Sequence, residues 1–207
     1  MRNKYNFYVQ DFENIRKDEY KQRTENLHIF HSLEWMNIIK ETFGIKHKIA
    51  ILEENGLVVA SIPFVKYYNI IKGSSALPLH FSGYYDSIIA NNDLVKKKII
   101  NLFFEFCKKN KLYTQVPEVN KIKDVPSFLG YSIYKMRLKA NLSVEEQIFK
   151  FANKRNRSYT KSAINSNLVS SIGSLELLDK FYLLYLQNMK ELGTPPLSKK
   201  YFKKIIE

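Results

Sequence analysis

The chain has 207 residues, of which 45% are hydrophobic and 14% aromatic, and it carries a formal net charge of +13 at pH 7. This much apolar material excludes a disordered tail and predicts one full hydrophobic core and part of another. The sequence has no apolar run of about 18 residues and no apolar leader, so we expect no transmembrane segment. The single cysteine, Cys107, excludes an internal disulfide and a cysteine-rich zinc site. Both observations predict a cytoplasmic protein.

The positive charge predicts attraction to polyanions such as nucleic acid, anionic lipid surfaces or phosphorylated precursors. Charge alone does not choose among them. The composition is also rich in lysine, asparagine and isoleucine, which is typical of an AT-rich genome and would raise the lysine content without any binding function. Both explanations of the charge are open.

The first part of the chain alternates between short β-rich runs and amphipathic stretches. The predicted strands are residues 5–9, 47–52, 57–64, 77–89, 112–116 and 131–142. The predicted helices are residues 33–40 between Ser32 and Gly44, a helix whose apolar face carries Ile99, Leu102, Phe103, Phe106 and Cys107, and a short piece at 125–129. The pair Asn55-Gly56 joins two of the strands as a hairpin. This order predicts an α/β (α+β mixed) fold, with a mixed central sheet flanked by helices, over residues 1–142.

The rest of the chain is predominantly helical. Ser143 and Glu146 form a capping box, and a basic helix over residues 153–164 follows. We expect residues 143–166 to be basic linker helices. In the third segment, residues 167–207, the pattern predicts a strand at 168–172 and two amphipathic helices, one over 175–192 that ends at Gly193 and one that begins at Ser198. Strand, helix, helix is also how the chain begins, so residues 167–207 are predicted to be an incomplete second domain.

Several segments, taken in order, carry a resemblance to a known family. They are Phe30-His31-Ser32-Leu33-Glu34-Trp35, the hairpin ending Ala60-Ser61-Ile62-Pro63-Phe64, Leu77-Pro78-Leu79-His80-Phe81-Ser82-Gly83-Tyr84, the basic stretch 154–163 and the segment 182–196. Together they resemble the FemAB-like branch of the GNAT acetyltransferase superfamily, which includes peptidoglycan-bridge aminoacyl transferases and bacterial relatives associated with exopolysaccharide export.

The resemblance implies two GNAT-like domains in tandem and an N-acyltransferase that passes an acyl or aminoacyl group to a cell-envelope or surface-polysaccharide precursor. The chain would hold the first domain and the start of the second, and would be inactive or incomplete in this form. Segment 193–196 is more similar to the exopolysaccharide-associated relatives, and Leu197 follows where peptidoglycan enzymes have a precursor-binding arginine. The implied acceptor is a small-molecule or lipid-linked envelope precursor, met in the cytoplasm at the inner face of the membrane.

The acyl donor implied by the resemblance is acetyl-CoA or an aminoacyl-tRNA. Acetyltransferases hold the coenzyme A pyrophosphate on a glycine-rich loop at a helix N-terminus. Residues 87–93 stand at that junction here and contain no glycine. We therefore expect no cofactor within this chain, and a donor site that belongs to the second domain or the interface.

The basic stretch supplies the first candidate site. Arg155, Arg157 and Lys161, with Lys150 and Lys154, could bind phosphates of an acceptor, because guanidinium groups bind phosphate bidentately. The alternative is a solvated linker helix. Lys40 is a second candidate, because the family resemblance implies a precursor-binding lysine on the helix that follows the tryptophan, although the spacing from the tryptophan differs here by one residue. The alternative is that Lys40 is an ordinary surface lysine.

Trp35 could stack on a sugar, although a hydrophobic anchor is the commoner role of a tryptophan. Tyr84 and Asp86 could line an acceptor cleft, or simply mark a strand end, and Asp86 or Glu118 could act as a general base. Cys107 shares an apolar helix face and is expected in the core. The scattered histidines give no metal-ligand spacing, so no metal is predicted.

Two other kinds of function fit the sequence. The charge of +13 is also typical of a nucleic-acid-binding module, for example one that binds tRNA. The apolar faces of residues 175–206 could instead dock on another chain, in which case the protein would be a non-catalytic partner subunit.

Overall fold

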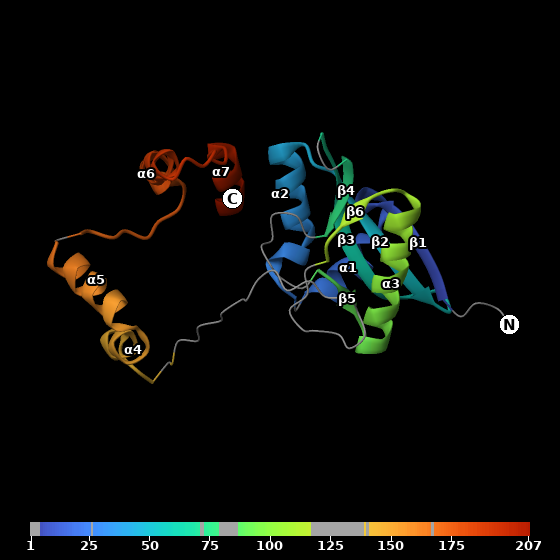
Figure 1. The fold of residues 1–207 in the computed structure, drawn as a ribbon, viewed down its shortest axis with the longest axis horizontal. Coiled ribbons are helices and arrows are strands. Elements are labelled where there is room, and N and C mark those ends of the chain that lie inside the picture. The colour runs from blue at the N-terminus through green and yellow to red at the C-terminus, as the bar shows by residue number, and fades with distance from the viewer. Residues whose placement is uncertain are drawn as a thin grey trace.

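The computed structural model describes residues 5–25, 27–70, 73–78, 87–116, 139, 141–166 and 168–207 (Figure 1). The strands are β1 (Tyr5–Asp11), β2 (His47–Glu54), β3 (Leu57–Asn69), β4 (Gly73–Pro78), β5 (Ile89–Ala90) and β6 (Tyr113–Thr114). The α-helices are α1 (Lys17–Thr24), α2 (Leu33–Phe43), α3 (Asp93–Lys109), α4 (Val144–Phe151), α5 (Lys154–Asn165), α6 (Leu178–Glu191) and α7 (Lys199–Ile206). Short 3-10 turns span Phe12–Asn14, Ile29–His31 and Leu175–Leu177.

One mixed sheet organises the first half of the chain. Its strand order is β1-β2-β3-β4-β6, and β5 pairs with β3 outside that path. The pairs β1-β2, β2-β3 and β3-β4 are antiparallel, whereas β6 runs parallel to β4. The parallel pair follows from the crossover through α3, because parallel strands need a long connection. The predicted mixed sheet flanked by helices is confirmed.

The two faces of the sheet carry separate apolar clusters, as the alternation of β2 dictates. Ala50 and Leu52 point to the face that α3 covers, where Phe64 and Phe103 meet with ring centroids 5.1 Å apart. Ile49 and Ile51 point to the opposite face, against α1 and α2. Cys107 is buried in the first cluster, as expected from its place on the apolar face of α3.

Local sequence signals produce the turns and helix ends that they predict. Asn55 and Gly56 both have positive φ, 53° and 81°, which is the backbone of a two-residue hairpin turn. Gly44 ends α2 in the left-handed conformation at φ 69°. The capping box is reciprocal: Ser143 N–H donates to Glu146 Oε2 at 2.8 Å, and Glu146 N–H donates to Ser143 Oγ at 3.1 Å.

The strand predicted at 168–172 is wrong. Residues 168–173 form no regular secondary structure, and the side chains of Leu168, Val169 and Ile172 are exposed. The run has the β-branched composition of a strand, but no strand of the described sheet pairs with it, and a lone strand is not stable in water. The helix predicted over 175–192 begins with a 3-10 turn and becomes α6 at Leu178. The pieces predicted at 79–86, 125–129 and 131–138 lie outside the described residues.

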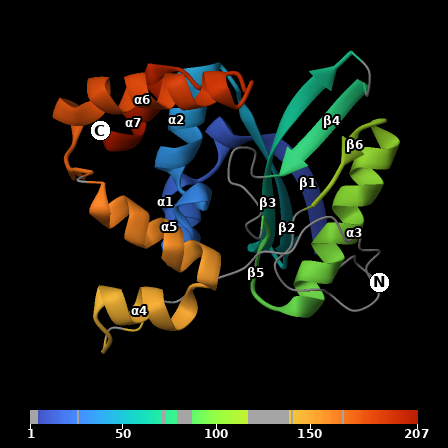
Figure 2. The same ribbon diagram turned by 60° about the vertical axis from the view of Figure 1, so that its left-hand side comes forward.

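Helices from the two ends of the sequence lie together. In both views α7 lies beside α2, with α6 next to it, whereas in Figure 1 the pair α4 and α5 projects away from the sheet (Figures 1 and 2). Within the described ranges, no helix is long and apolar enough to cross a membrane.

Candidate functional site

The helix α2 carries two of the residues that the sequence singles out. Ser32 begins it, because its side chain accepts a hydrogen bond from Trp35 N–H at 3.0 Å. The helix then places Trp35 and Ile39 on one face and Lys40 on another. This separation gives the two candidate residues different surroundings.

Trp35 lies in an aromatic seam, by which we mean the contact of α2 with α7. Its side chain is 5% exposed, and its ring centroid lies 4.8 Å from Phe30 and 6.2 Å from Tyr201. Tyr201 in turn packs on Phe43 at 5.4 Å and on Phe202 at 5.5 Å. The Trp35 Nε1 donor is buried and has no hydrogen-bond partner among the described residues. The position is that of a hydrophobic anchor, and the predicted substrate-binding role of Trp35 stays a prediction.

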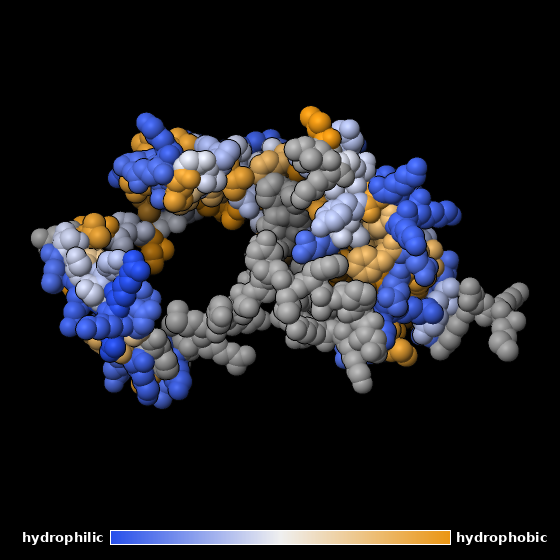
Figure 3. Space-filling model, in the orientation of Figure 1, coloured by the Kyte–Doolittle hydropathy of each residue, from blue (hydrophilic) through white to orange (hydrophobic). Residues whose placement is uncertain are grey.

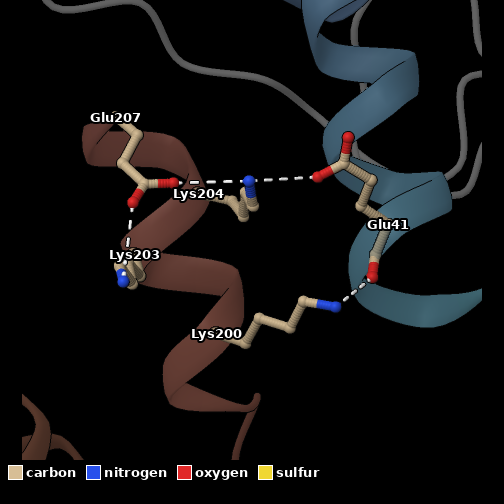
Figure 4. A network of polar contacts seen from close by, with 5 residues as sticks. All are labelled: Glu41, Lys200, Lys203, Lys204 and Glu207. Carbon is tan, nitrogen blue, oxygen red and sulfur yellow. Dashed lines mark hydrogen bonds and ion pairs between the residues drawn. The ribbon is translucent and has the colours of Figure 1, made fainter.

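A polar rim of lysine and glutamate side chains also links α7 to α2 (Figure 4). Lys200 Nζ donates to the backbone carbonyl of Glu41 at 2.6 Å, and Lys204 Nζ lies 3.1 Å from the Glu41 carboxylate. Hydrogen bonds to Glu41 and then to Glu207 raise the pKa of Lys204. Exposed ion pairs of this kind contribute little stability, so the rim fixes the orientation of α7 while the aromatic rings provide the burial.

Lys40 faces away from the seam and forms an ion pair with Glu13, with Nζ 2.7 Å from Oε1. The hydrogen bond from Lys40 lowers the pKa of the Glu13 carboxyl. Both side chains are about half exposed, at 46% and 54%, so the pair is weak and an anionic ligand could replace Glu13 at low cost. The structure therefore permits both interpretations of Lys40.

The helix α5 carries the basic cluster and has no buried residue (Figure 3 shows hydrophilic side chains gathered over α4 and α5). Arg157 donates to the backbone carbonyl of Phe149 at 3.3 Å, and Lys161 Nζ lies 5.4 Å from the Phe149 ring. Arg155 is on another face, where its Nε donates to the Tyr159 hydroxyl at 3.1 Å. The helix thus brings Arg157 and Lys161 together and separates Arg155 from them. In the part of the chain that the structure describes, none of the three has a carboxylate partner.

Tyr84, Asp86 and Glu118 lie outside the described residues, so their predicted roles stay predictions. The glycine-free junction at residues 87–93 contains Asn92, whose side chain accepts from Val95 N–H at 3.0 Å and caps α3. A side chain thus occupies one of the backbone donors that would otherwise be available to a phosphate. No cluster of metal-ligating side chains occurs in the described ranges.

Sequence reasoning missed two parts of this region. Tyr201 and Glu13 are the contacts of Trp35 and Lys40, and both come from segments distant in the sequence, so local patterns contain no signal for them. Helix α1 and the cavity beneath it were also missed. Arg16, directly before α1, and three residues of α1 line the cavity at the helical positions i, i+3, i+4 and i+7, but they are mostly charged, so an apolar stripe does not mark them: Arg16, Glu19, Tyr20 and Arg23.

Comparison with known proteins identifies the class of fold. No protein-family model and no curated protein matches the sequence. Among solved structures, the crystal structure of FemX aligns with 96% of this chain at a TM-score of 0.54 and 15% identity. The chain spans about half of FemX, 54% of its length.

Two acetyltransferases are more distantly similar. Ribosomal-protein-alanine N-acetyltransferase from Brucella melitensis biovar Abortus 2308 aligns with 65% of the chain, and 99% of itself, at a TM-score of 0.40 and 10% identity. Glucosamine-6-phosphate N-acetyltransferase from Arabidopsis thaliana aligns with 82% of the chain, and 99% of itself, at 0.34 and 12%. The FemX match shows that the chain has a fold like that of FemX, which confirms the fold that the sequence resemblance implies.

Proposed function

We propose that this chain is the acceptor-binding part of a FemAB-like N-acyltransferase, and that its acceptor is an anionic precursor of the cell envelope or of a surface polysaccharide. The observation that carries the proposal is the docking of α7 on α2, with α6 packed against α7, together with the alignment of 96% of the chain on FemX. In this proposal residues 167–207 are the start of a second unit, and the seam holds them against the first, beside the helix that carries Trp35 and Lys40.

In this proposal the basic side chains bind the phosphates of the acceptor. Arg157 and Lys161 form one positive surface on α5, and Lys40 forms another on α2. The acceptor amine would attack the carbonyl carbon of the donor, and the new amide bond would replace the thioester bond of acetyl-CoA or the ester bond of an aminoacyl-tRNA. The amine loses a proton, and coenzyme A leaves as a thiol, or the tRNA with a free hydroxyl, after taking up a proton. Asp86 or Glu118 would accept the proton of the amine, and the donor would be held outside the residues described here.

Binding of a sugar nucleotide tests the proposal directly. UDP-N-acetylglucosamine supplies a pyrophosphate and a sugar, and its affinity is measured by calorimetry at about 50 mM and 200 mM salt. The variant with Arg155→Gln, Arg157→Gln and Lys161→Gln is compared with wild type. The matched control carries Lys21→Gln, Lys108→Gln and Lys109→Gln, which removes the same charge from exposed positions of α1 and α3.

A hydrogen bond to a charged group contributes about 1.5–3 kcal/mol, so loss of the α5 charges should weaken binding at least about tenfold. The control should bind within about threefold of wild type. Equal weakening in both variants would show only general charge attraction, and absence of binding in the wild type would refute the phosphate-binding role.

A tRNA-binding function is the second candidate, because α5 is an exposed basic helix without carboxylate partners among the described residues. Affinity for tRNA that survives about 200 mM salt, with a salt slope that falls by about 0.9 for each lost phosphate contact, would favour it. Sensitivity of tRNA affinity, and not of sugar-nucleotide affinity, to the α5 substitutions would assign the helix to the donor.

The third interpretation, a partner subunit, rests on the apolar residues of α6 that α7 leaves uncovered. Leu183 and Leu184 are both 69% exposed. A homogeneous monomer in analytical ultracentrifugation, with no partner recovered by pull-down, would contradict this interpretation.

A further inference from the structure

One end of the sheet exposes three tyrosines and an isoleucine, which we call the tyrosine tip. Tyr67 and Tyr68 lie near the end of β3 and are 50% and 69% exposed, and Ile70, at the turn toward β4, is 91% exposed. Tyr113, the first residue of β6, is 54% exposed. Tyr67 is paired with Ser75 of β4, and Ser75 is paired with Tyr113. Because neighbouring strands are about 4.8 Å apart, the backbones of Tyr67 and Tyr113 are about 10 Å apart.

The tip is exposed on both faces of the sheet. Strand β2 begins at His47, which pairs with Val65, so residues 66–69 of β3 have only β4 as a neighbour in the described sheet. Figure 2 shows the β3–β4 hairpin projecting from the sheet. Successive residues of a strand point to opposite faces, and both Tyr67 and Tyr68 are exposed. A partner of the tip therefore has to surround the hairpin and not only cover one of its faces.

Exposed lysines lie next to the tip, and we call them the basic collar. Lys66 precedes Tyr67 on β3, and the others lie at the end of α3 and in the turn that leads to β6: Lys108, Lys109 and Lys111. Within the described ranges, no carboxylate lies within ion-pair distance of any of the four. The collar thus carries a positive charge that the described part of the chain does not neutralise.

The backbone at Lys111 shows that this lysine is not the residue that folding alone would favour. Helix α3 ends in a Schellman motif, in which Leu112 N–H donates to the Cys107 carbonyl at 2.8 Å and Lys111 N–H donates to the Lys108 carbonyl at 3.1 Å. The residue at the position of Lys111 in this motif is usually glycine, because its φ is positive, and here φ is 53°. Residues that break a local rule are expected at functional sites.

We propose that this end of the molecule docks on the surface of an anionic lipid bilayer. Ile70 enters the boundary of the acyl chains, and the three tyrosines lie at the level of the headgroups, where a ring with an apolar body and a polar hydroxyl is favoured. The basic collar contacts lipid phosphates, because a lysine can lay its apolar stem along the tip and keep its ammonium group at the headgroups. The inference goes beyond the proposed function and does not depend on it.

A bilayer fits the tip better than other partners do. It is fluid, so it closes around a projecting hairpin from both sides, whereas a protein surface covers one face. Nucleic acid bases stack on tyrosine but gain little from an isoleucine that is 91% exposed. The collar and the formal net charge of +13 complement an anionic surface. Apolar contact combined with attraction to anionic lipid is the usual basis of interfacial binding.

Vesicle sedimentation with the full chain tests the proposal. We expect at least about tenfold tighter binding to phosphatidylcholine vesicles with about 30% phosphatidylglycerol than to phosphatidylcholine alone. Ile70→Ser should weaken binding to the anionic vesicles about tenfold, because it removes the apolar contact. The control Leu94→Ser changes a leucine that is 75% exposed at the opposite end of α3, and it should bind as wild type does. Absence of wild-type binding, or equal weakening by both substitutions, overturns the proposal.

The variant Lys111→Gly separates docking from folding. Glycine suits the left-handed backbone, so the free energy of unfolding should equal or exceed that of wild type, while affinity for the anionic vesicles should fall about fivefold. The charge control is Lys21→Gln, an exposed lysine of α1, which should change the affinity less than about twofold. Equal losses in both variants would show that only total charge matters, and would overturn the assignment to the tip.

The position of the tip in the bilayer is measured by tryptophan fluorescence. In Ile70→Trp, the added emission should shift to shorter wavelength and be quenched by brominated lipid, whereas in Leu94→Trp it should be unchanged; Trp35 is 5% exposed and contributes equally to both. Equal quenching in the two variants overturns the proposal. So does loss of tRNA affinity with unchanged vesicle affinity in Tyr68→Ala, which would assign the tip to nucleic acid. UDP-N-acetylglucosamine binding, which tests the proposed function, should be unchanged in every variant.

Discussion

The aromatic seam between α2 and α7 can be broken by a single substitution, Tyr201→Ala. The tyrosine is 9% exposed and contacts the rings of Trp35, Phe43 and Phe202. An aromatic side chain of this kind buries about 200 Å², and about 25 cal/mol per Å² gives about 5 kcal/mol as an upper estimate. Truncation of buried aromatic residues costs about 3–5 kcal/mol in general. We expect a loss of about 3 kcal/mol or more at the seam.

The loss should be local, because α6 and α7 reach the rest of the described chain mainly through α2. The only tryptophan and the only cysteine report the two regions separately. Trp35 lies in the seam, so its fluorescence emission should shift to longer wavelength when α7 detaches. Cys107 lies in the sheet core, so its thiol should stay unreactive. Amide hydrogen exchange should accelerate in α6 and α7 but not in α3.

The control for this substitution is Leu184→Ala on α6, where the side chain is 69% exposed and lies outside the seam. Its emission spectrum and exchange pattern should equal those of wild type. Unchanged Trp35 emission and unchanged exchange in Tyr201→Ala would refute the energetic importance of the seam. Simultaneous exposure of Cys107 would show instead that α7 and the sheet unfold as one cooperative unit.

Three further predictions concern the sheet and its helices. Burial raises the pKa of Cys107 to about 11. At pH 8 its thiol should therefore react with a disulfide reagent at least about 100-fold more slowly in the folded chain than in the urea-unfolded chain. Equal rates would contradict the buried position. Burial, followed by the hydrogen bond to Glu53, raises the pKa of Tyr8 to about 12. The contribution of Tyr8 to the free energy of unfolding is therefore constant below about pH 10. It falls between pH 10 and 12, because the phenol of the unfolded chain loses its proton first. The free energy of unfolding should therefore decline more steeply over that interval in wild type than in Tyr8→Phe, and parallel curves in urea titrations would disprove the assignment. Asn92→Ala removes the cap of α3 and should lower the free energy of unfolding by about 1 kcal/mol, whereas the nearby exposed change Asn101→Ala should be close to neutral.

Sequence reasoning succeeded where the information is local. Ser32, the pair Asn55-Gly56, and the box of Ser143 and Glu146 each fix a turn or a helix end within a few residues, and the structure has all three. The runs at 47–52 and 57–64 were also predicted to be strands of one hairpin, and they form β2 and β3. Such signals depend on backbone geometry and on nearest neighbours, so no knowledge of the fold is needed to interpret them.

The failed predictions have one physical cause: the composition of a short segment does not determine which distant segment it pairs with. The run at 168–172 has the β-branched residues of a strand but lacks a described partner strand. Helix α1 lacks an apolar stripe and is held by Tyr20, Thr24 and Arg23 through contacts with the sheet and with its own backbone. Its cavity could not be predicted, because the two walls come from α1 and from strands that follow it at a distance.

The stripe predicted over residues 175–192 shows how far an amphipathic pattern can be taken. The pattern indicates that one face is covered, and the structure shows by what: Leu178 is buried, and the hydroxyls of Tyr182 and Tyr185 hydrogen-bond to the backbone of Leu197 on the approach to α7. Helix α7 in turn packs its Tyr201 ring against Trp35 of α2. A sugar cannot stack on an indole that is 5% exposed and already packed against Tyr201. If Trp35 binds the acceptor, α7 must first move away, so a more stable seam would mean weaker binding of the acceptor. Tyr201→Ala should then strengthen sugar-nucleotide binding. If Trp35 is only an anchor, the substitution should leave that binding unchanged.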